Sequence, residues 1–232
     1  MSDDPKFNAA RAALDFIEDG MIVGLGTGST SAHFVRQLGE RMKQGLKVKG
    51  VPTSEATRNL AEQVGVPLLE ISQVTAIDVD VDGADEIDPQ FRLIKGGGGA
   101  LLREKIVAAA SKRMVVIADS SKWVETLGAF PLPVEVTRFG FALTQARIHE
   151  ALRLTGCAGD EVVLRVSGKA NEPVITDGGN YILDAHALHI PNADALGEAL
   201  KQIAGVVEHG LFLGLAQTVI LGTASGAEVK SL

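Results

Sequence analysis

The stretch MIVGLGTGST, residues 21–30, joins a short apolar segment to a loop of glycines and hydroxyl side chains. An apolar run of this length that ends at glycine predicts a buried strand over residues 21–25. A helix is predicted directly after the loop, because apolar side chains recur there at helical spacing: Phe34, Val35, Leu38 and Met42. A strand, a tight loop and a helix in this order are typical of a parallel α/β sheet.

The same alternation of strands and helices continues on both sides of this stretch. Asp4 and Pro5 predict the start of an N-terminal helix, and Ser54 predicts the start of a helix that ends at Gly65. Further strands are predicted at residues 48–51, 77–82 and 114–118, with a helix over about 100–112. We therefore expect an α/β fold with a Rossmann-like, mostly parallel sheet and helices on both faces.

The pattern changes after residue 130. Strands are predicted at 134–136, 162–166, 181–184 and 206–208, and helices at 141–154 and 193–203. The order β-α-β-β-α-β is typical of a small ferredoxin-like α+β domain, which we place at residues 131–206. Residues 216–222 and 227–230 predict a strand and turn that return to the first sheet, so residues 1–130 and 207–232 are expected to form the α/β catalytic domain.

Composition excludes several classes of function. The chain has 232 residues, 46% of them hydrophobic, and a net charge of −7, which argues against nonspecific binding to DNA or to a membrane surface. The single cysteine, Cys157, excludes an intrachain disulfide and a cysteine-rich metal site. The acidic N-terminus lacks an apolar signal segment, and no run approaches the roughly 18 apolar residues of a membrane span. We expect a cytoplasmic protein.

The loop at residues 26–30 is a candidate anion site, because a helix N-terminus presents unpaired N–H groups. It lacks the lysine of a P-loop, and Ser29 stands where a dinucleotide fingerprint has its third glycine. The strand that follows also ends without an acidic residue. A tight turn and a polyol or phosphate site remain as interpretations, and the hydroxyls of Thr27, Ser29 and Thr30 favour the second.

Carboxylates crowd the end of the strand at residues 77–82, in the sequence Asp82-Gly83-Ala84-Asp85-Glu86. Ligands of α/β sheets bind at the carboxyl ends of the strands, and clustered carboxylates raise one another's pKa, which suits proton transfer. A solvated acidic turn and a divalent-metal site are the alternatives. The metal interpretation is weak because no histidine or cysteine accompanies the cluster, and His186 and His189 are not spaced to share a metal.

A second glycine loop, Lys95-Gly96-Gly97-Gly98-Gly99, places a cation beside a backbone that a ligand can approach closely. The helix after it carries apolar side chains around its axis, so we expect it to be largely enclosed. Arg103, Glu104 and Lys105 lie near the start of this helix, where such charges must pair or line a cavity. Glu104 is therefore a candidate general base.

Six segments, in order over nearly the whole chain, resemble the type A ribose-5-phosphate isomerases: GLGTGST, DGADEID, KGGGGALLREKIV, IADSSK, FPLPVEV and TDGGNYILD. The resemblance implies an enzyme of the non-oxidative pentose phosphate pathway that interconverts D-ribose 5-phosphate and D-ribulose 5-phosphate without a metal or cofactor. It also implies a homodimer or a dimer of dimers.

By position, the resemblance makes Glu104 the proton-shuttling base. It makes the following residues substrate-binding: Thr27, Gly28, Ser29, Thr30, Asp82, Gly83, Ala84, Asp85, Lys95, Gly96, Gly97, Gly98 and Lys122. The chemistry fits, because one carboxylate can move a proton between two carbons while Lys95 and loop N–H groups stabilise the enediolate. Asp82 and Asp85 are candidates for opening the sugar ring, and residues 52–56 receive no role.

Two other classes of protein are weighed against an isomerase. A sugar-phosphate sensor of a transcriptional regulator would carry a basic DNA-binding module, for which the acidic N-terminus leaves no room. Such a sensor would also have no need for Glu104 together with Lys95. A sugar-phosphate deaminase or a CoA transferase would lack DGADEID and KGGGG as a pair.

Overall fold

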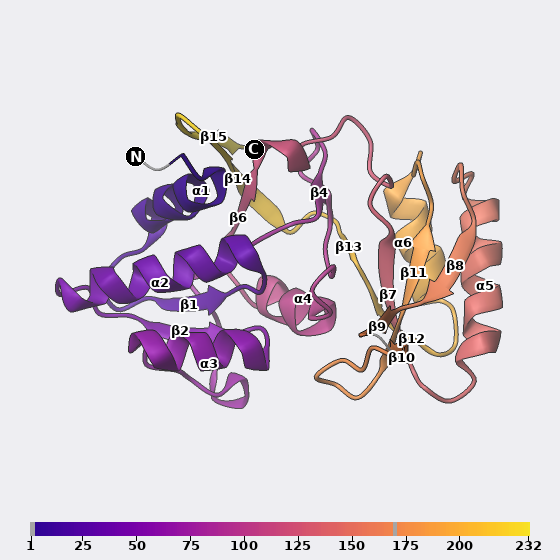
Figure 1. Ribbon diagram of the computed structural model, residues 1–232, viewed down its shortest axis with the longest axis horizontal. Coiled ribbons are helices and arrows are strands. Elements are labelled where there is room, and N and C mark those ends of the chain that lie inside the picture. The colour runs from indigo at the N-terminus through magenta and orange to yellow at the C-terminus, as the bar shows by residue number, and fades with distance from the viewer. Residues whose placement is uncertain (1–2, 169–170) are drawn as a thin grey trace. The chain divides into compact units, whose positions relative to one another are not determined.

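The computed structural model describes residues 3–168 and 171–232, which form two compact units (Figure 1). The first unit comprises Met1–Ala84, Arg103–Trp123 and Gly214–Leu232. The second comprises Asp85–Leu102 and Val124–Leu213.

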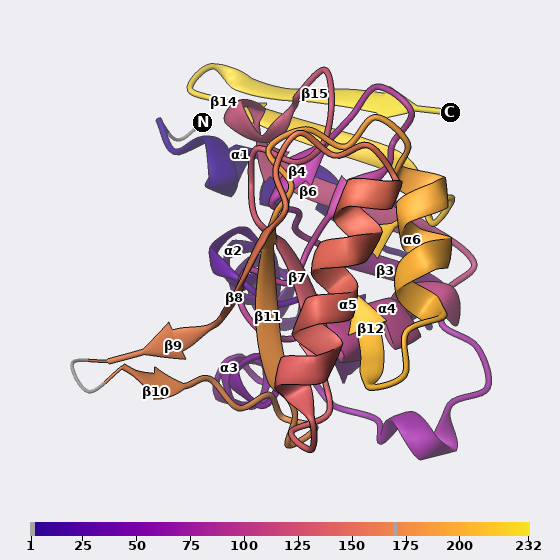
Figure 2. The same ribbon diagram turned by 90° about the vertical axis from the view of Figure 1, so that its right-hand side faces the viewer.

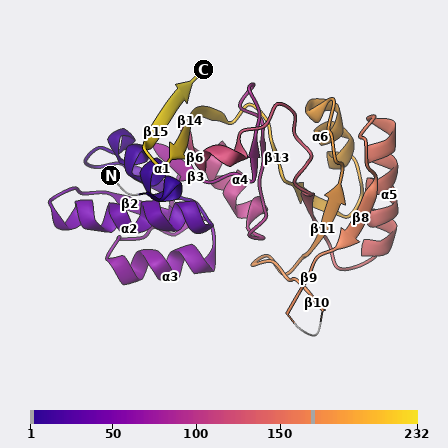
Figure 3. The same cartoon turned by 45° about the horizontal axis from the view of Figure 1, so that its top comes forward.

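A six-stranded sheet in the order β15-β14-β6-β3-β1-β2 forms the centre of the first unit. Its strands are β1 (Ile22–Leu25), β2 (Lys49–Pro52), β3 (Val79–Asp82), β6 (Met114–Asp119), β14 (Ala216–Thr223) and β15 (Gly226–Ser231). All neighbours pair in parallel except β15, which returns antiparallel to β14 at the C-terminus (Figure 3). The predicted mostly parallel sheet is confirmed.

The strand order reverses direction between β1 and β3, since the chain goes from β1 outward to β2 and then back across to β3. Open α/β sheets bind ligands at such a switch point, beyond the carboxyl ends of the strands, because the connecting loops diverge there. Gly26–Gly28 form the loop directly after β1, and Asp82 is the last residue of β3.

Helices cover both faces of this sheet, as predicted. They are α1 (Pro5–Ala13), α2 (Ser29–Lys43), α3 (Glu55–Val64) and α4 (Leu101–Ala109), with short 3-10 turns η1 (Leu14–Phe16), η2 (Ile71–Gln73) and η3 (Ser120–Lys122). Val23 and Leu25 of β1 join one core with α1, α2 and α3. A side chain at position 24 would lie on the opposite face of the sheet. There, a Cβ added to Gly24 would be only 2.7 Å from Val107 of α4.

The expectation of a largely enclosed α4 is wrong. Its buried residues lie along one stripe, Leu101, Glu104, Val107 and Ala108, whereas Ile106 is 49% exposed and Ala109 is also exposed. A helix that packs on one face of a sheet buries one stripe only, and the apolar residues of its outer face stay in solvent.

Strand β3 is confirmed as a strand, but its alternating pattern does not produce an exposed face. All four residues are buried, and Asp80 and Asp82 are 0% exposed. The reason is that β3 lies between β1 and β6 in a sheet covered on both faces.

The second unit contains the predicted β-α-β-β-α-β arrangement. Its elements are β7 (Leu132–Val136), α5 (Phe141–Leu154), β8 (Glu161–Leu164), β11 (Tyr181–His186), α6 (Ala193–Lys201) and β12 (Val206–His209). The strands form an antiparallel sheet in the order β12-β7-β11-β8, and α5 and α6 lie side by side (Figure 2). Leu183 and Ala185 of β11 join the core that these helices enclose.

Additional short strands extend the second unit beyond residues 131–206. A three-stranded sheet joins β4 (Glu86–Ile87), β5 (Leu93–Ile94) and β13 (Leu211–Phe212), while β9 (Val166–Ser167) and β10 (Glu172–Pro173) pair in a hairpin. Pairing of β5 with β13 places residues 85–102 and 207–213 in this unit, although the sequence pattern assigns them to the α/β domain. Two-residue strands are too short to show a period, so the sequence does not reveal this pairing.

Candidate active site

The loop between β1 and α2 presents the open N-terminus of a 15-residue helix. No side chain of the described residues caps this helix at Gly28, and Gly28 and Ser29 are exposed. The first N–H groups of α2 therefore face solvent, where they and the helix dipole favour an anion. The loop at residues 26–30 thus lies at an open helix N-terminus, and anion binding there stays a prediction.

Lys6 of α1 lies beside this loop and was not among the residues predicted from the sequence. Its Nζ donates a hydrogen bond of 3.0 Å to Oγ of Ser29. The ammonium thus adds a positive charge to the helix N-terminus. No local pattern identifies Lys6, because it lies 23 residues before Ser29 and on a different helix.

Thr27 is held from inside the first unit. Its hydroxyl lies 2.7 Å from that of Thr53 and 2.8 Å from that of Ser54, and Thr57 is 3.2 Å away. Its backbone N–H donates to Asp82 at 3.1 Å. The Thr27 hydroxyl therefore orders the loop. Residues 52–56, which received no role from the sequence, contribute to that order through Thr53 and Ser54.

Asp82 joins the ends of β1 and β3 at the switch point. Its Oδ1 accepts from the N–H of Gly83 at 2.7 Å, from Thr27 and from the hydroxyl of Ser31 at 3.3 Å. A Cβ at Gly26 would lie 2.0 Å from this oxygen and 2.6 Å from Cα of Asp82. Only glycine fits at position 26, because the second clash involves backbone that cannot rotate away.

The first turn of α4 lies at the same edge of the sheet. Arg103 pairs with Glu55, the first residue of α3, at 2.7 Å, and α3 begins just beyond the end of β2. Val107, one turn further along, packs over β1. Glu104 shares the buried stripe with Val107 and is 3% exposed. A carboxylate near the carboxyl ends of parallel strands is well placed for chemistry on a ligand.

Lys122 also follows the carboxyl end of a strand. It lies in η3, directly after β6, and is half-buried. The Asp119 carboxylate accepts from the N–H of Ser121 and so fixes the turn that carries Lys122.

In the second unit, the loop at Lys95–Gly98 is bound to Asp85. The N–H of Gly97 donates to Oδ2 of Asp85 at 2.8 Å, and the N–H of Asp85 donates to the carbonyl of Ile94 at 2.8 Å. A Cβ at Gly97 would lie 2.7 Å from the Asp85 carboxylate. A side chain at this position would therefore separate the loop from Asp85.

Lys95 is 2% exposed and directly follows β5. Its N–H donates to the carbonyl of Gly210 at 2.9 Å, and its Nζ lies 5.3 Å from the centre of the Phe212 ring. The aromatic face attracts the ammonium and limits where it can point.

The acidic segment after β3 separates into two kinds of carboxylate. Glu86 is buried and accepts from the N–H groups of Gly128 at 2.7 Å and Phe130 at 2.6 Å. Asp88 is 0% exposed and pairs with Arg92 at 2.6 Å. These two stabilise the second unit, which leaves Asp82 and Asp85 as the carboxylates of this segment that are candidates for chemistry.

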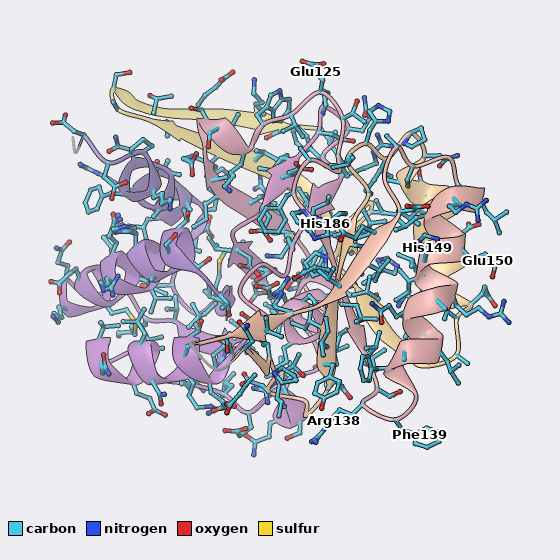
Figure 4. All side chains as sticks on the ribbon, turned by 45° about the vertical axis from the view of Figure 1, so that its right-hand side comes forward. Glu125, Arg138, Phe139, His149, Glu150 and His186 are labelled. Atoms are coloured by element: carbon cyan, nitrogen blue, oxygen red, sulfur yellow. The ribbon has the colours of Figure 1, made fainter. Side chains whose placement is uncertain are left out.

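The titratable side chains of the described residues show no metal-binding arrangement. Within residues 3–168 and 171–232 there is no group of three or more His, Cys, Asp or Glu that could hold a metal ion. Figure 4 labels His149, which lies on α5, and His186, which ends β11. Burial raises the pKa of the Cys157 thiol, an effect that a hydrogen bond with Thr155 reduces, so this thiol is protonated at neutral pH. Among the described helices, none has the length and apolarity to cross a membrane.

Acid–base chemistry on a small anionic molecule is the class of reaction that an open helix N-terminus and a buried glutamate, both in the first unit, suit. The family model of ribose 5-phosphate isomerase A (phosphoriboisomerase A) matches residues 49–226. The chain belongs to this family, which confirms the resemblance found in the sequence.

Relatives of this family match nearly the whole chain. The ribose-5-phosphate isomerase A of Maricaulis maris is 56% identical over 224 residues, which are 97% of this chain and 96% of the relative. The solved isomerase of Methanocaldococcus jannaschii is 39% identical, with a TM-score of 0.89 and coverage of 99% of both chains. A second solved isomerase, 40% identical with a TM-score of 0.91 and full coverage of both chains, is in complex with phospho-erythronic acid.

Proposed function

We propose that this chain interconverts D-ribose 5-phosphate and D-ribulose 5-phosphate through an enediolate. Membership in the isomerase family along nearly the whole chain carries this proposal. The phospho-erythronic acid bound by a relative adds support, because its carboxylate resembles the two oxygens of an enediolate. The rival classes, a sensor, a deaminase or a CoA transferase, have no comparable support.

The base in this mechanism is Glu104. Its carboxylate takes the proton from C2 of the open-chain aldose and returns it to C1, which gives the ketose. Both carbons are adjacent and the proton stays on one face, so a single carboxylate serves both steps. Burial supports this role, because a base shielded from bulk water is less prone to lose the proton during transfer.

Lys95 and the loop N–H groups stabilise the enediolate. Negative charge develops on the oxygens at C1 and C2 as the proton leaves, and fixed donors lower its free energy most in a site that excludes water. Lys95 is itself buried, and the backbone of Gly98 is exposed, while the N–H of Gly97 is donated to Asp85. Gly96 completes the binding segment.

Ring opening precedes proton transfer and requires an acid and a base near the ring oxygen and the anomeric hydroxyl. We assign these roles to Asp82 and Asp85. Asp85 is the partly accessible one of the pair, while Asp82 is buried and also organises the loop at Thr27. Gly83 and Ala84 connect the two and present backbone groups to the sugar.

The phosphate is assigned to the N-terminus of α2. The open N–H groups, the hydroxyls of Ser29 and Thr30, and the Lys6 ammonium form an anion site within the first unit. Lys122 supplies further positive charge to the substrate. In this assignment, the loop at Lys95–Gly98 binds the oxygens of the sugar.

Replacement of Lys6 by methionine, which keeps the length of the side chain without its charge, is expected to raise KM for ribose 5-phosphate by about 10- to 100-fold with kcat little changed. A charge-assisted hydrogen bond to phosphate contributes about 1.5–3 kcal/mol, equally in the ground and transition states. Steady-state kinetics measures both constants. Lys43→Met is the matched control, because Lys43 lies at the opposite end of α2 and pairs with Glu40. An unchanged KM in Lys6→Met would show that the substrate phosphate does not bind at this site.

The proposed reaction itself is tested with the purified chain and ribose 5-phosphate, after exhaustive dialysis against a chelator. We expect ribulose 5-phosphate to form, and activity to survive the chelator, because proton transfer by a carboxylate requires neither metal nor redox cofactor. No ketose product, or activity that only a divalent ion restores, would contradict the mechanism.

We also propose that the enzyme is cytoplasmic and assembles as a homodimer or a dimer of dimers. The support is the resemblance to the isomerase family together with the acidic, cysteine-poor composition. Analytical ultracentrifugation of the purified chain distinguishes these assemblies from a monomer.

A further inference from the structure

Arg165 lies between β8 and β9, where the backbone holds it on both sides. Its N–H donates to the carbonyl of Ile182 at 2.9 Å, and its carbonyl accepts from Val174 at 2.9 Å. The register of β8 with β11 pairs Leu164 with Leu183, so Arg165 lies opposite Ile182. Its side chain therefore shares a face of β11 with Asp184, diagonally across the strand pair.

The Arg165 guanidinium connects Asp184 to the glycine loop. Nε donates to Oδ2 of Asp184 at 2.8 Å, and Nη2 donates to Oδ1 of the same carboxylate. Nη1 donates to the carbonyls of Gly96 at 2.8 Å and Gly97 at 3.1 Å. The side chains of Arg165 and Asp184 are only 15% and 17% exposed, so water competes little for these bonds. All of these residues belong to the second unit.

These two carbonyl contacts determine where the next N–H groups point. In a trans peptide the C=O of one residue and the N–H of the next point in opposite directions. With the carbonyls of Gly96 and Gly97 turned toward Arg165, the N–H groups of Gly97 and Gly98 point away from it. In agreement with this geometry, the N–H of Gly97 donates a hydrogen bond to the Asp85 carboxylate. The N–H of Gly98 follows on the same side of the loop, where a backbone N–H favours an anion.

We propose that Arg165 is a positioning residue of the isomerase, which orients the N–H of Gly98 for the enediolate oxygens while the N–H of Gly97 holds Asp85, and that Asp184 holds Arg165 in place. The inference rests on the role of the glycine loop in the proposed function. Glycine peptides rotate freely, and a donor stabilises developing charge only when its direction is fixed before the reaction. Arg165 supplies that constraint through its hydrogen bonds to the loop carbonyls.

Arg165→Lys is the test, because lysine keeps a positive charge but cannot bind a carboxylate and two carbonyls at once with a planar fork. We expect kcat to fall by about 10- to 100-fold, as for a misplacement of about 1 Å in an active site. KM for ribose 5-phosphate and the melting temperature should change little, because the misdirected donors act chiefly on the transition state. Asp184→Asn should lower kcat in the same direction by a smaller factor.

Arg92→Lys is the matched control, since Arg92 also pairs with a buried carboxylate, Asp88, in the second unit but does not contact the glycine loop in any bond of the described residues. It should keep kcat. The proposal is overturned if a folded Arg165→Lys variant keeps wild-type kcat, changes KM alone, or loses no more activity than Arg92→Lys. If Arg165→Lys shows no melting transition, kcat of Asp184→Asn is compared with that of Arg92→Lys instead, and an unchanged kcat overturns the proposal. If the proposed function itself is wrong, the wild-type chain will show no isomerase activity in the same assay.

Discussion

Glu104→Gln is expected to lower kcat for the isomerisation about 10²–10⁴-fold, the usual effect of losing a positioned general base. Glutamine keeps the shape and hydrogen-bonding reach of glutamate but cannot accept the proton from C2. Because Glu104 is 3% exposed, the substitution also removes a buried negative charge without leaving a cavity. The fold should therefore persist while the chemistry stops.

The direct measurement is exchange of the C2 proton of ribose 5-phosphate in deuterated water, with the melting temperature and substrate affinity determined on the same sample. Glu62→Gln is a suitable control, because Glu62 is an exposed residue of α3. A stable Glu104→Gln variant that binds substrate and exchanges the proton at the wild-type rate would show that Glu104 is not the base. Asp82 or Asp85 would then be the first alternative.

Lys95→Ala is expected to lower kcat about 10²–10³-fold, as the loss of one donor to a developing oxyanion does. The ammonium is buried beside Phe212, so in this position its charge is poorly screened by water and acts strongly on the enediolate. KM should rise less than kcat falls, because the charge that Lys95 stabilises is largest in the transition state.

Lys95→Met separates charge from packing, since it fills most of the lysine volume without the ammonium. We expect Lys95→Met to be as inactive as Lys95→Ala but closer to wild type in melting temperature. Steady-state kinetics and thermal unfolding of both variants make the comparison. Unchanged kcat with a raised KM would instead assign Lys95 to binding the phosphate or a hydroxyl.

Local patterns were sufficient for much of the fold. The strand, loop and helix at residues 21–43, the cap at Ser54 and the return of residues 216–230 to the first sheet were all predicted and are present. Each depends on neighbours within a few residues, through apolar periodicity, capping oxygens or glycine at a turn. The β-α-β-β-α-β order of the second unit followed from the same signals.

The exposed face of α4 and the pairing of β5 with β13 were not predictable in this way. Apolar periodicity does not tell whether a helix has partners on one side or two, and two-residue strands carry no periodic signal. Similarly, the alternation in β3 indicated a strand but not that Asp80 and Asp82 are buried, which depends on where the strand lies within the sheet.

The sequence by itself determined which residue types are available for the chemistry: two glycine loops, the carboxylates that follow β3, and a glutamate at the start of a helix. Only the tertiary structure decided how they are held. Several of the hydrogen bonds that hold them join residues 23 to 69 positions apart in the sequence. These are the bonds of Lys6 to Ser29, of Thr53 to Thr27, and of Arg165 to the carbonyls of Gly96 and Gly97. Such hydrogen bonds leave no local pattern, because they depend on the directions in which folded elements present their side chains and peptide groups.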